Sequence, residues 1–152
     1  MRISAKADYA VRALLVLARA DPERVTADQI AQAQDIPPRF LEAVLGDLRR
    51  AGLVTSQRGR QGGHRLSRCA KDISLGQAVR GIDGPLVFVN GERPPDLDYR
   101  EEAKMLLPVW VAVRVAVRRV LDEVSLADLR DQRLPDDVRA LVNDPQAWSN
   151  DP

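Results

Sequence analysis

The chain has 152 residues, of which 45% are hydrophobic and 30% are charged, and its formal net charge is +1. A chain of this length can bury a sizeable core without disulfides or metals, so we expect one ordinary domain or one small domain with an appendage. One cysteine and one histidine exclude an intrachain disulfide and any metal site that needs several cysteines from one chain, and they argue against an enzyme.

The two helices nearest the N-terminus are predicted from their caps. Ser4 is a candidate N-cap for a first helix with an apolar stripe, and Asp21 with the proline after it ends that helix. Thr26 and Gln29 form the T-x-x-Q pattern of a capping box, in which each side chain hydrogen-bonds to the other residue's backbone. This box predicts a short second helix.

A third helix is predicted to begin at Pro38, which suits the first turn of a helix, and to end before Gly52. Arg39 and Glu42 lie in its first turns, one turn apart on one face. The predicted inner face of this helix consists of Phe40, Leu41, Val44, Leu45 and Leu48.

A β-hairpin with a basic loop is predicted next. Two short strands, residues 53–57 and 64–67, flank a glycine-rich loop at 58–63. The segment from Arg49 to Lys71 contains seven cations and no acid. A cluster of one sign favours an anionic partner, although a solvated basic loop would have the same composition. The seven are Arg49, Arg50, Arg58, Arg60, Arg65, Arg68 and Lys71.

A fourth helix, a linker and a long helix follow. Ser74 and Gln77 form a second capping box. Prolines and glycines interrupt residues 84–100, which we interpret as a loop or linker. The long helix covers residues 101–124, and Pro108 predicts either that its regular part begins late or that it kinks.

The long helix is apolar on most of its sides, so most of its sides must be covered. The N-terminal domain can cover one face, and a second copy of the same helix is the simplest cover for the rest. We therefore predict a homodimer. The candidate dimerisation residues are Leu106, Trp110, Val113, Val117, Val120 and Leu121.

The last part of the chain is predicted to be less regular. Ser125 and Asp128 predict a short helix that begins at Leu126. We place residues 101–133 in the dimerisation region and interpret residues 134–152 as a C-terminal tail that frays after Pro145.

Three short helices followed by a hairpin predict a mainly α protein with a winged helix-turn-helix domain at residues 1–83. In such a domain the third helix enters the major groove of double-stranded DNA, and the hairpin tip, the wing, reaches neighbouring backbone or the minor groove. Arg can bind guanine, and Glu can accept a hydrogen bond from cytosine. The same architecture also occurs in protein-interaction modules. The candidate DNA contacts are Ser4, Lys6, Arg39, Glu42, Arg49, Arg58 and Arg60.

Several segments resemble the Rrf-type winged-helix transcriptional regulators, the group of IscR, NsrR and CymR. They are ISAKADYAVRALLVLA, IPPRFLEAVLGDLRRAGLVTSQRGRQGGHRLS and SLGQAVRGIDGPL, and the most specific motif is the wing R-G-x-x-G-G-x-x-L from Arg58 to Leu66. VWVAVRVAVRRVLDEVSLADL resembles the dimerisation helix of that family and the short helix after it. The resemblance covers about residues 1–130.

The resemblance implies a homodimeric repressor or activator that binds a dyad-symmetric operator, and we expect a repressor. It adds Pro38, Gln61 and Gly62 to the candidate DNA contacts. His64 stands where the family's wing usually ends in an aromatic residue, and we expect it to stack within the wing or to touch a phosphate.

The sequence departs from the family at the site of its cofactor. Many members bind an iron–sulfur cluster through three cysteines in the loop before the long helix. Residues 84–107 of this chain contain no cysteine. We therefore expect no cluster and no metal cofactor.

The signal for such a regulator stays open at this point. Arg68 and Lys71 could lower the pKa of the Cys69 thiol for a thiol switch, or Cys69 could be an ordinary small residue that closes the wing. Trp110 could line a pocket for a small-molecule effector, or it could belong to the dimer core. A protein effector is a third possibility.

The sequence has no apolar run long enough for a membrane span, and its N-terminus lacks the pattern of a signal peptide. We expect a cytoplasmic protein without membrane segments.

Overall fold

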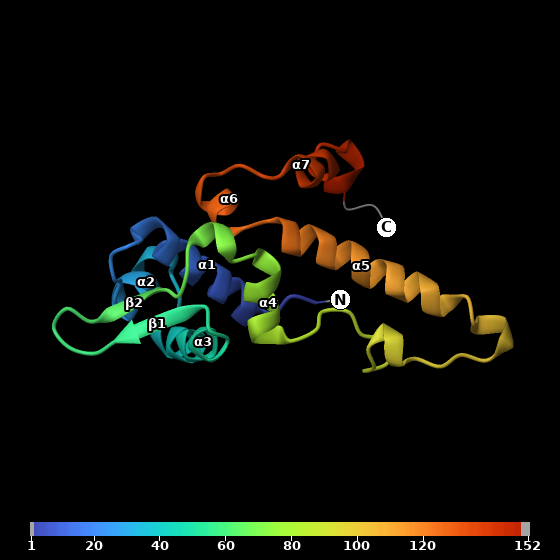
Figure 1. The fold of residues 1–152 in the computed structure, drawn as a ribbon, viewed down its shortest axis with the longest axis horizontal. Helices are drawn as coiled ribbons and strands as arrows, with labels where there is room; N and C mark the ends of the chain where they lie inside the picture. Colours follow the sequence, from blue (N-terminus) through green and yellow to red (C-terminus); the bar gives the residue numbers. More distant parts are fainter. Residues whose placement is uncertain (1, 150–152) are drawn as a thin grey trace.

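The computed structural model, which describes residues 2–149, is mainly helical with one small sheet (Figure 1). Three helices, α1 (Ala5–Ala20), α2 (Ala27–Gln34) and α3 (Pro38–Arg50), precede the strands β1 (Val54–Gln57) and β2 (Gly63–Leu66). This is the element order of a winged helix-turn-helix domain, as the sequence predicts.

Polar caps fix where the helices begin. The Ser4 hydroxyl accepts the Ala7 N–H at the start of α1, and Thr26 and Gln29 make both hydrogen bonds of a capping box at α2. The boxes predicted at Ser74 and Ser125 are also present. A cap of this kind stabilises a helix by about 1 kcal/mol, so these residues set the helix boundaries.

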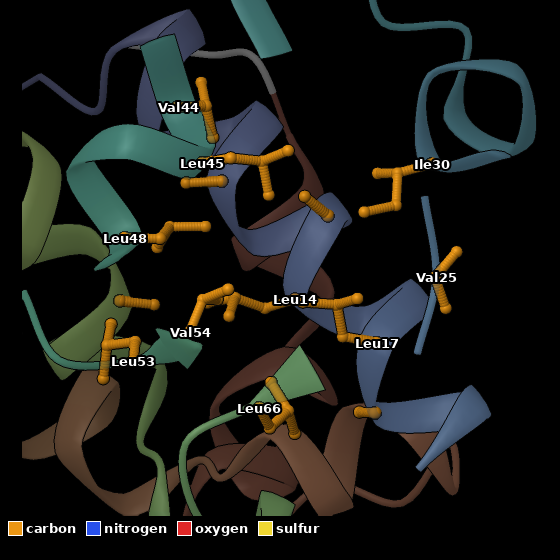
Figure 2. Close-up of a cluster of buried hydrophobic side chains, with 14 of the residues drawn as sticks. Leu14, Leu17, Val25, Ile30, Val44, Leu45, Leu48, Leu53, Val54 and Leu66 are labelled. Atoms are coloured by element: carbon orange, nitrogen blue, oxygen red, sulfur yellow. The ribbon is translucent and has the colours of Figure 1, made fainter. Parts of the chain in front are cut away.

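The core of this domain is built around α1, which contacts α2, α3, α4, α6 and β2. Leu14 and Leu17 lie at its centre with at most 1% of their surface exposed, and side chains from α2, α3 and the hairpin close around them (Figure 2). Four of the five residues predicted for the inner face of α3 are buried there. The prediction is wrong for Phe40, which is 61% exposed because it lies on the flank of the helix.

The hairpin is held to the domain through a third short pairing. β1 and β2 are antiparallel, with Val54 opposite Leu66. Val25, between α1 and α2, pairs with His64 through two backbone hydrogen bonds of 2.9 and 2.8 Å. Gly63 has a φ of +138°, and a Cβ there would lie 2.8 Å from the Val25 carbonyl oxygen. Only glycine therefore allows this close pairing.

The C-terminal half begins with α4 (Leu75–Asp83) and a linker that contains two 3-10 turns, Pro94–Asp96 and Glu101–Ala103. The long helix α5 (Leu106–Glu123) begins only two residues before Pro108, so the late-start alternative is correct and the proline lies in the first turn of the helix. The short helix α6 (Leu126–Arg130) returns the chain to α1. Figure 1 shows the wing and the linker at opposite ends of the molecule.

The segment interpreted as a tail contains a helix that the sequence reading missed. α7 (Asp136–Val142) packs near the end of α5, and a 3-10 turn follows at Pro145–Trp148. The Arg119 guanidinium donates to the Asp137 carboxylate over 2.8 Å and ties α7 to α5. Residues 150–152, which belong to the segment predicted to fray, lie outside the described residues. No helix in the described part is long and apolar enough to cross a membrane.

Candidate nucleic-acid interface

The outer face of α3 is polar and exposed because its other face is used by the core. Leu41, Val44, Leu45 and Leu48 are buried, whereas Pro38, Arg39, Glu42 and Arg49 are exposed, as are Ala43 and Arg50. Arg39 and Glu42 are three residues apart and therefore neighbours on this face. The face offers one guanidinium and one carboxylate at its N-terminal end and two guanidinium groups at its C-terminal end.

Phe40 adds an apolar contact beside that face. Its ring lies 6.5 Å from the Tyr9 ring, centroid to centroid, and the Arg12 guanidinium lies 5.4 Å from the Tyr9 centroid. An exposed aromatic side chain such as Phe40 suits contact with a sugar or a thymine methyl group. Sequence reasoning missed Phe40 because its position next to Leu41 is equally compatible with a wide apolar stripe.

The wing presents its cations without competing acids. Arg58, Arg60 and Gln61 are exposed, and Gly62 closes the loop by donating its N–H to the Gly59 carbonyl oxygen over 2.8 Å. A Cβ at Gly62 would lie 2.5 Å from the Gln57 carbonyl oxygen, so the sharp return of the chain depends on this glycine. The loop thus exposes both arginines beside the hairpin.

All seven cations between residues 49 and 71 are exposed. Of these seven, only Arg50 has a carboxylate partner among the described residues, Asp47 of the same helix. The sequence predicts this cluster, and the structure brings its members from α3 and from the wing into one domain.

His64 lies at the base of the wing between two guanidinium groups. Burial and the charges of Arg49 and Arg24 lower its pKa from the ordinary value of 6.5, so the ring is neutral at pH 7. Its Nδ1 atom is buried and has no hydrogen-bond partner among the described residues. Arg49 donates to the Ser56 hydroxyl over 3.4 Å and Arg24 donates to the Gly63 carbonyl over 3.3 Å. His64 is half-buried at the wing base. The two arginines beside it link the hairpin to α3 and to the loop after α1.

Ser4 and Lys6 make contacts within the chain. The Ser4 N–H and hydroxyl both donate to the Asp83 carboxylate, over 2.9 and 2.5 Å, and join the start of α1 to the end of α4. Lys6 forms an ion pair with Asp47 of α3, and 44% of its side chain stays exposed. Ser4 thus has no free donor for a phosphate, whereas the side chain of Lys6 stays partly exposed.

One side of α5 is apolar and uncovered in the single chain. Leu106, Val109 and Val113 are 42, 50 and 41% exposed, and Ala116 is exposed as well. With the half-buried Val120, these residues alternate spacings of three and four, which is the pattern of a helix–helix seam. We call these five residues the α5 seam.

The six predicted dimerisation residues divide between two sides of α5. Leu106, Val113 and Val120 belong to the α5 seam. Leu121 is only 9% exposed and Val117 is half-buried against the chain's own elements. The half-buried Trp110 donates its indole N–H to the Tyr99 hydroxyl over 3.1 Å, which holds the linker on α5.

The donor set does not fit an iron–sulfur cluster. An iron–sulfur cluster takes several cysteine thiolates as ligands, and the chain has only Cys69, which is exposed after β2. Within residues 2–149 no three His, Cys, Asp or Glu side chains lie together in a way that could hold a metal ion.

Comparisons with known proteins agree with this geometry. Residues 3–132 match the Rrf2 family, described as iron-dependent transcriptional regulators. A protein of Mycobacterium tuberculosis named as an HTH-type transcriptional regulator is 45% identical over 148 residues, which are 97% of this chain and 92% of that protein. The structure of CymR, the global cysteine regulator of B. subtilis, has a TM-score of 0.73 at 32% identity and covers 87% of this chain and 98% of its own. IscR of T. potens has a TM-score of 0.67 at 29% identity and covers 100% of this chain and 94% of its own.

Proposed function

Because the chain belongs to the Rrf2 family of transcriptional regulators, we propose that it is a homodimeric repressor that binds a dyad-symmetric DNA operator without an iron–sulfur cluster. The observation that carries this proposal is the cluster of seven exposed cations on α3, the wing and the segment after it, of which only Arg50 has a carboxylate partner among the described residues. Such a surface is stabilised by a polyanion. A regulator of this kind acts on the chromosome, in the cytoplasm.

The outer face of α3 is the element that reads bases in this proposal. With α3 in the major groove, Arg39 donates two hydrogen bonds to guanine O6 and N7, and Glu42 accepts one from cytosine N4. Pro38 and Phe40 lie at the same end of the helix and contact the backbone and apolar base edges. Arg49 lies near the other end and pairs with a phosphate.

The wing is the element that reads shape. Arg58 and Arg60 reach the adjacent minor groove or its phosphates, where a narrow groove strengthens the negative potential. Gln61 and Gly62 approach the backbone, and His64 supports the wing from inside. Lys6 adds a phosphate contact at the start of α1, while Ser4 acts through its hydrogen bonds to Asp83.

The α5 seam is the element that forms the dimer. Leaving the exposed apolar surface of this seam in water is unfavourable by about 25 cal/mol per Å², so a second copy of α5 is the natural cover. Two copies related by a twofold axis present two α3 helices, which require an operator with the same symmetry.

DNA-affinity selection from the source genome tests this proposal. The recovered fragments are measured by fluorescence anisotropy at two salt concentrations, with scrambled DNA of the same composition as the control. We expect dyad-symmetric sites in promoters and an affinity that falls steeply with salt. Recovery of no common sequence, together with tight binding to an acidic protein, would show that the domain is a protein-interaction module.

Repression itself is tested by a reporter under a recovered promoter. Expression is expected to rise when the gene for the regulator is deleted. A fall in expression would identify an activator and overturn the repressor part of the proposal.

A further inference from the structure

A pocket lies between the DNA-binding domain and the long helix. Its volume is about 230 Å³, and its walls come from α4, from the first residues of the linker and from the middle of α5. Pro85, Leu86 and Val117 supply apolar surface. The pocket is distinct from the contact of Trp110, which lies nearer the start of the same helix.

The charged residues of this pocket are all cations. Arg80, Arg114 and Arg118 line it, and no acid does. Asp122, one turn away, accepts a hydrogen bond of 2.6 Å from Arg80 and lies 3.8 Å from Arg118. One carboxylate is therefore shared by two guanidinium groups, and Arg114 has no carboxylate partner among residues 2–149.

One guanidinium nitrogen of Arg80, a residue that lines the pocket, has no partner within the described part of the chain. Arg80 Nη1 is buried and has no hydrogen-bond partner among the described residues. Three guanidinium groups with one carboxylate between them carry an excess of positive charge, which a second anion would neutralise. Arginine forks suit carboxylate and phosphate groups, and the apolar walls suit a short hydrocarbon part.

We propose that this pocket binds a small organic anion, a carboxylate or a phosphate with a short apolar part, and that this anion changes the affinity for the operator. The second half of this proposal rests on the proposed function. The anion would join α4, which belongs to the DNA-binding domain, to α5, which carries the seam of the dimer.

The contacts around the pocket explain how binding there is transmitted. α4 is joined to α1 by the two hydrogen bonds from Ser4 to Asp83, at the residue that precedes the linker. α5 lies so close to α4 that a Cβ on Gly76 would be 2.1 Å from Asp122 Oδ1. A ligand that bridges the two helices therefore sets the angle between them, and with it the spacing of the two α3 helices in the dimer.

The first test measures binding to the free protein. Isovalerate and butyl phosphate are titrated while the methyl resonances of Val87 and Val117 are followed by NMR, with the neutral isovaleramide as the control ligand. We expect one of the anions to bind in the millimolar range or tighter and the amide to leave these resonances unchanged. Binding of neither anion, or equal binding of the amide, would overturn the site.

Two variants locate the binding. Arg114→Gln removes a cation of the pocket, and we expect it to weaken anion binding at least about tenfold, as for the loss of a charged hydrogen bond. Arg119→Gln is the matched control, because Arg119 lies on another side of α5 and pairs with Asp137. Equal weakening by both variants would show a general charge effect and contradict the pocket.

The second test measures regulation. We expect the anion to change the operator affinity of the wild-type protein by about fivefold or more, which is a typical coupling between two sites. Arg114→Gln is expected to lose this response and to keep the operator affinity of the anion-free protein. If the anion binds but the operator affinity does not change, the proposed regulation is wrong. If the wild type does not bind DNA, the proposed function is wrong, and the anion titrations still show whether the pocket binds an anion.

Discussion

Arg58 and Arg60 are exposed on the two sides of Gly59, in a loop whose own backbone hydrogen bond holds its shape. Neither side chain packs in the core, so we expect both to contribute to binding and not to the stability of the fold. The same reasoning applies to Arg39 and Glu42 on α3. These residues are therefore the places where DNA binding and folding can be separated by mutation.

Arg60→Ala is expected to weaken operator binding by about 1–3 kcal/mol and to leave the melting temperature unchanged. The substitution removes a charge and a contact that depends on groove shape, but no buried contact. Anisotropy on the operator and a thermal melt measure the two effects. Arg93→Ala, which removes an exposed arginine of the linker, is the control and should bind like the wild type. Wild-type affinity for Arg60→Ala would contradict the placement of the wing.

Glu42→Ala is expected to raise non-specific DNA binding, because it removes a negative charge that faces DNA in the proposed complex. Discrimination between the operator and scrambled DNA should fall by about 1–3 kcal/mol, the range of a good base contact. Anisotropy with both DNAs at two salt concentrations measures the difference. Full discrimination by the variant would mean that α3 does not read bases through Glu42.

His64 makes stability depend on pH. Its pKa is lowered in the folded chain, chiefly by burial and then by Arg49 and Arg24, so the unfolded chain binds the proton more readily. The stability that this neutral ring contributes is present above its unfolded pKa of about 6.5 and is lost as pH falls through the lower folded pKa. Urea unfolding above and below that range should show a larger loss for the wild type than for His64→Gln. An equal loss in both proteins would contradict this account of the wing base.

Side chains that face a neighbour in space are the hardest to predict from one sequence. The wing arginines and the outer face of α3 follow from local spacing, and they are exposed as predicted. The environments of Phe40 and Leu121 could not be predicted in this way. An apolar residue on the flank of a helix gives the same sequence pattern whether water, the domain or a partner chain covers it. The acceptors of the Ser4 and Trp110 donors, Asp83 and Tyr99, come from distant or irregular segments that no helical periodicity specifies.

At the scale of elements, the caps explain why the predicted order of helices is correct. The boxes at Thr26, Ser74 and Ser125 are local patterns, and each is present. α7 was missed although Asp136 and Asp137 follow Pro135, which is a favourable start for a helix. Its seven residues are too few for a periodic signal, and its position against α5 depends on the pairing of Asp137 with Arg119.

The α5 seam predicts which substitutions on the long helix would break the proposed dimer. Val113→Asp is expected to place an unpaired charge in the interface and to give monomers or aggregates. Val115→Asp is the matched control, because Val115 is 55% exposed but lies off the seam. Size-exclusion chromatography with light scattering measures the mass of each protein at micromolar concentration. A monomeric wild type, or a dimeric Val113→Asp protein, would contradict the seam.

At the scale of the whole molecule, the chain links a DNA-binding domain to a long helix through α4, and the charged pocket lies at this link. The sequence predicts both parts because each has a pattern of its own. It does not predict the pocket, whose arginines come from α4 and α5 and meet only when the two helices pack.

The shortage of cysteine ligands predicts a protein without an iron–sulfur cluster. After anaerobic purification we expect a colourless protein with no bound iron or acid-labile sulfide, because the chain has one cysteine and none between residues 84 and 107. Metal analysis and a visible spectrum measure this directly. Stoichiometric iron and sulfide with charge-transfer bands would show that ligands other than three cysteines hold a cluster.

The most direct test of the central claim is a hydroxyl-radical footprint of the protein on a recovered operator, combined with the mass of the complex. Two chains on one site should protect two half-sites related by a twofold axis, with centres one or more DNA turns apart, about 34–36 Å per turn. Protection by α3 in each half-site should be flanked by protection from the wing, and Arg60→Ala should lose only the flanking part. A single asymmetric footprint, or a complex that contains one chain, would contradict the account of a symmetric dimer reading DNA through α3 and the wing.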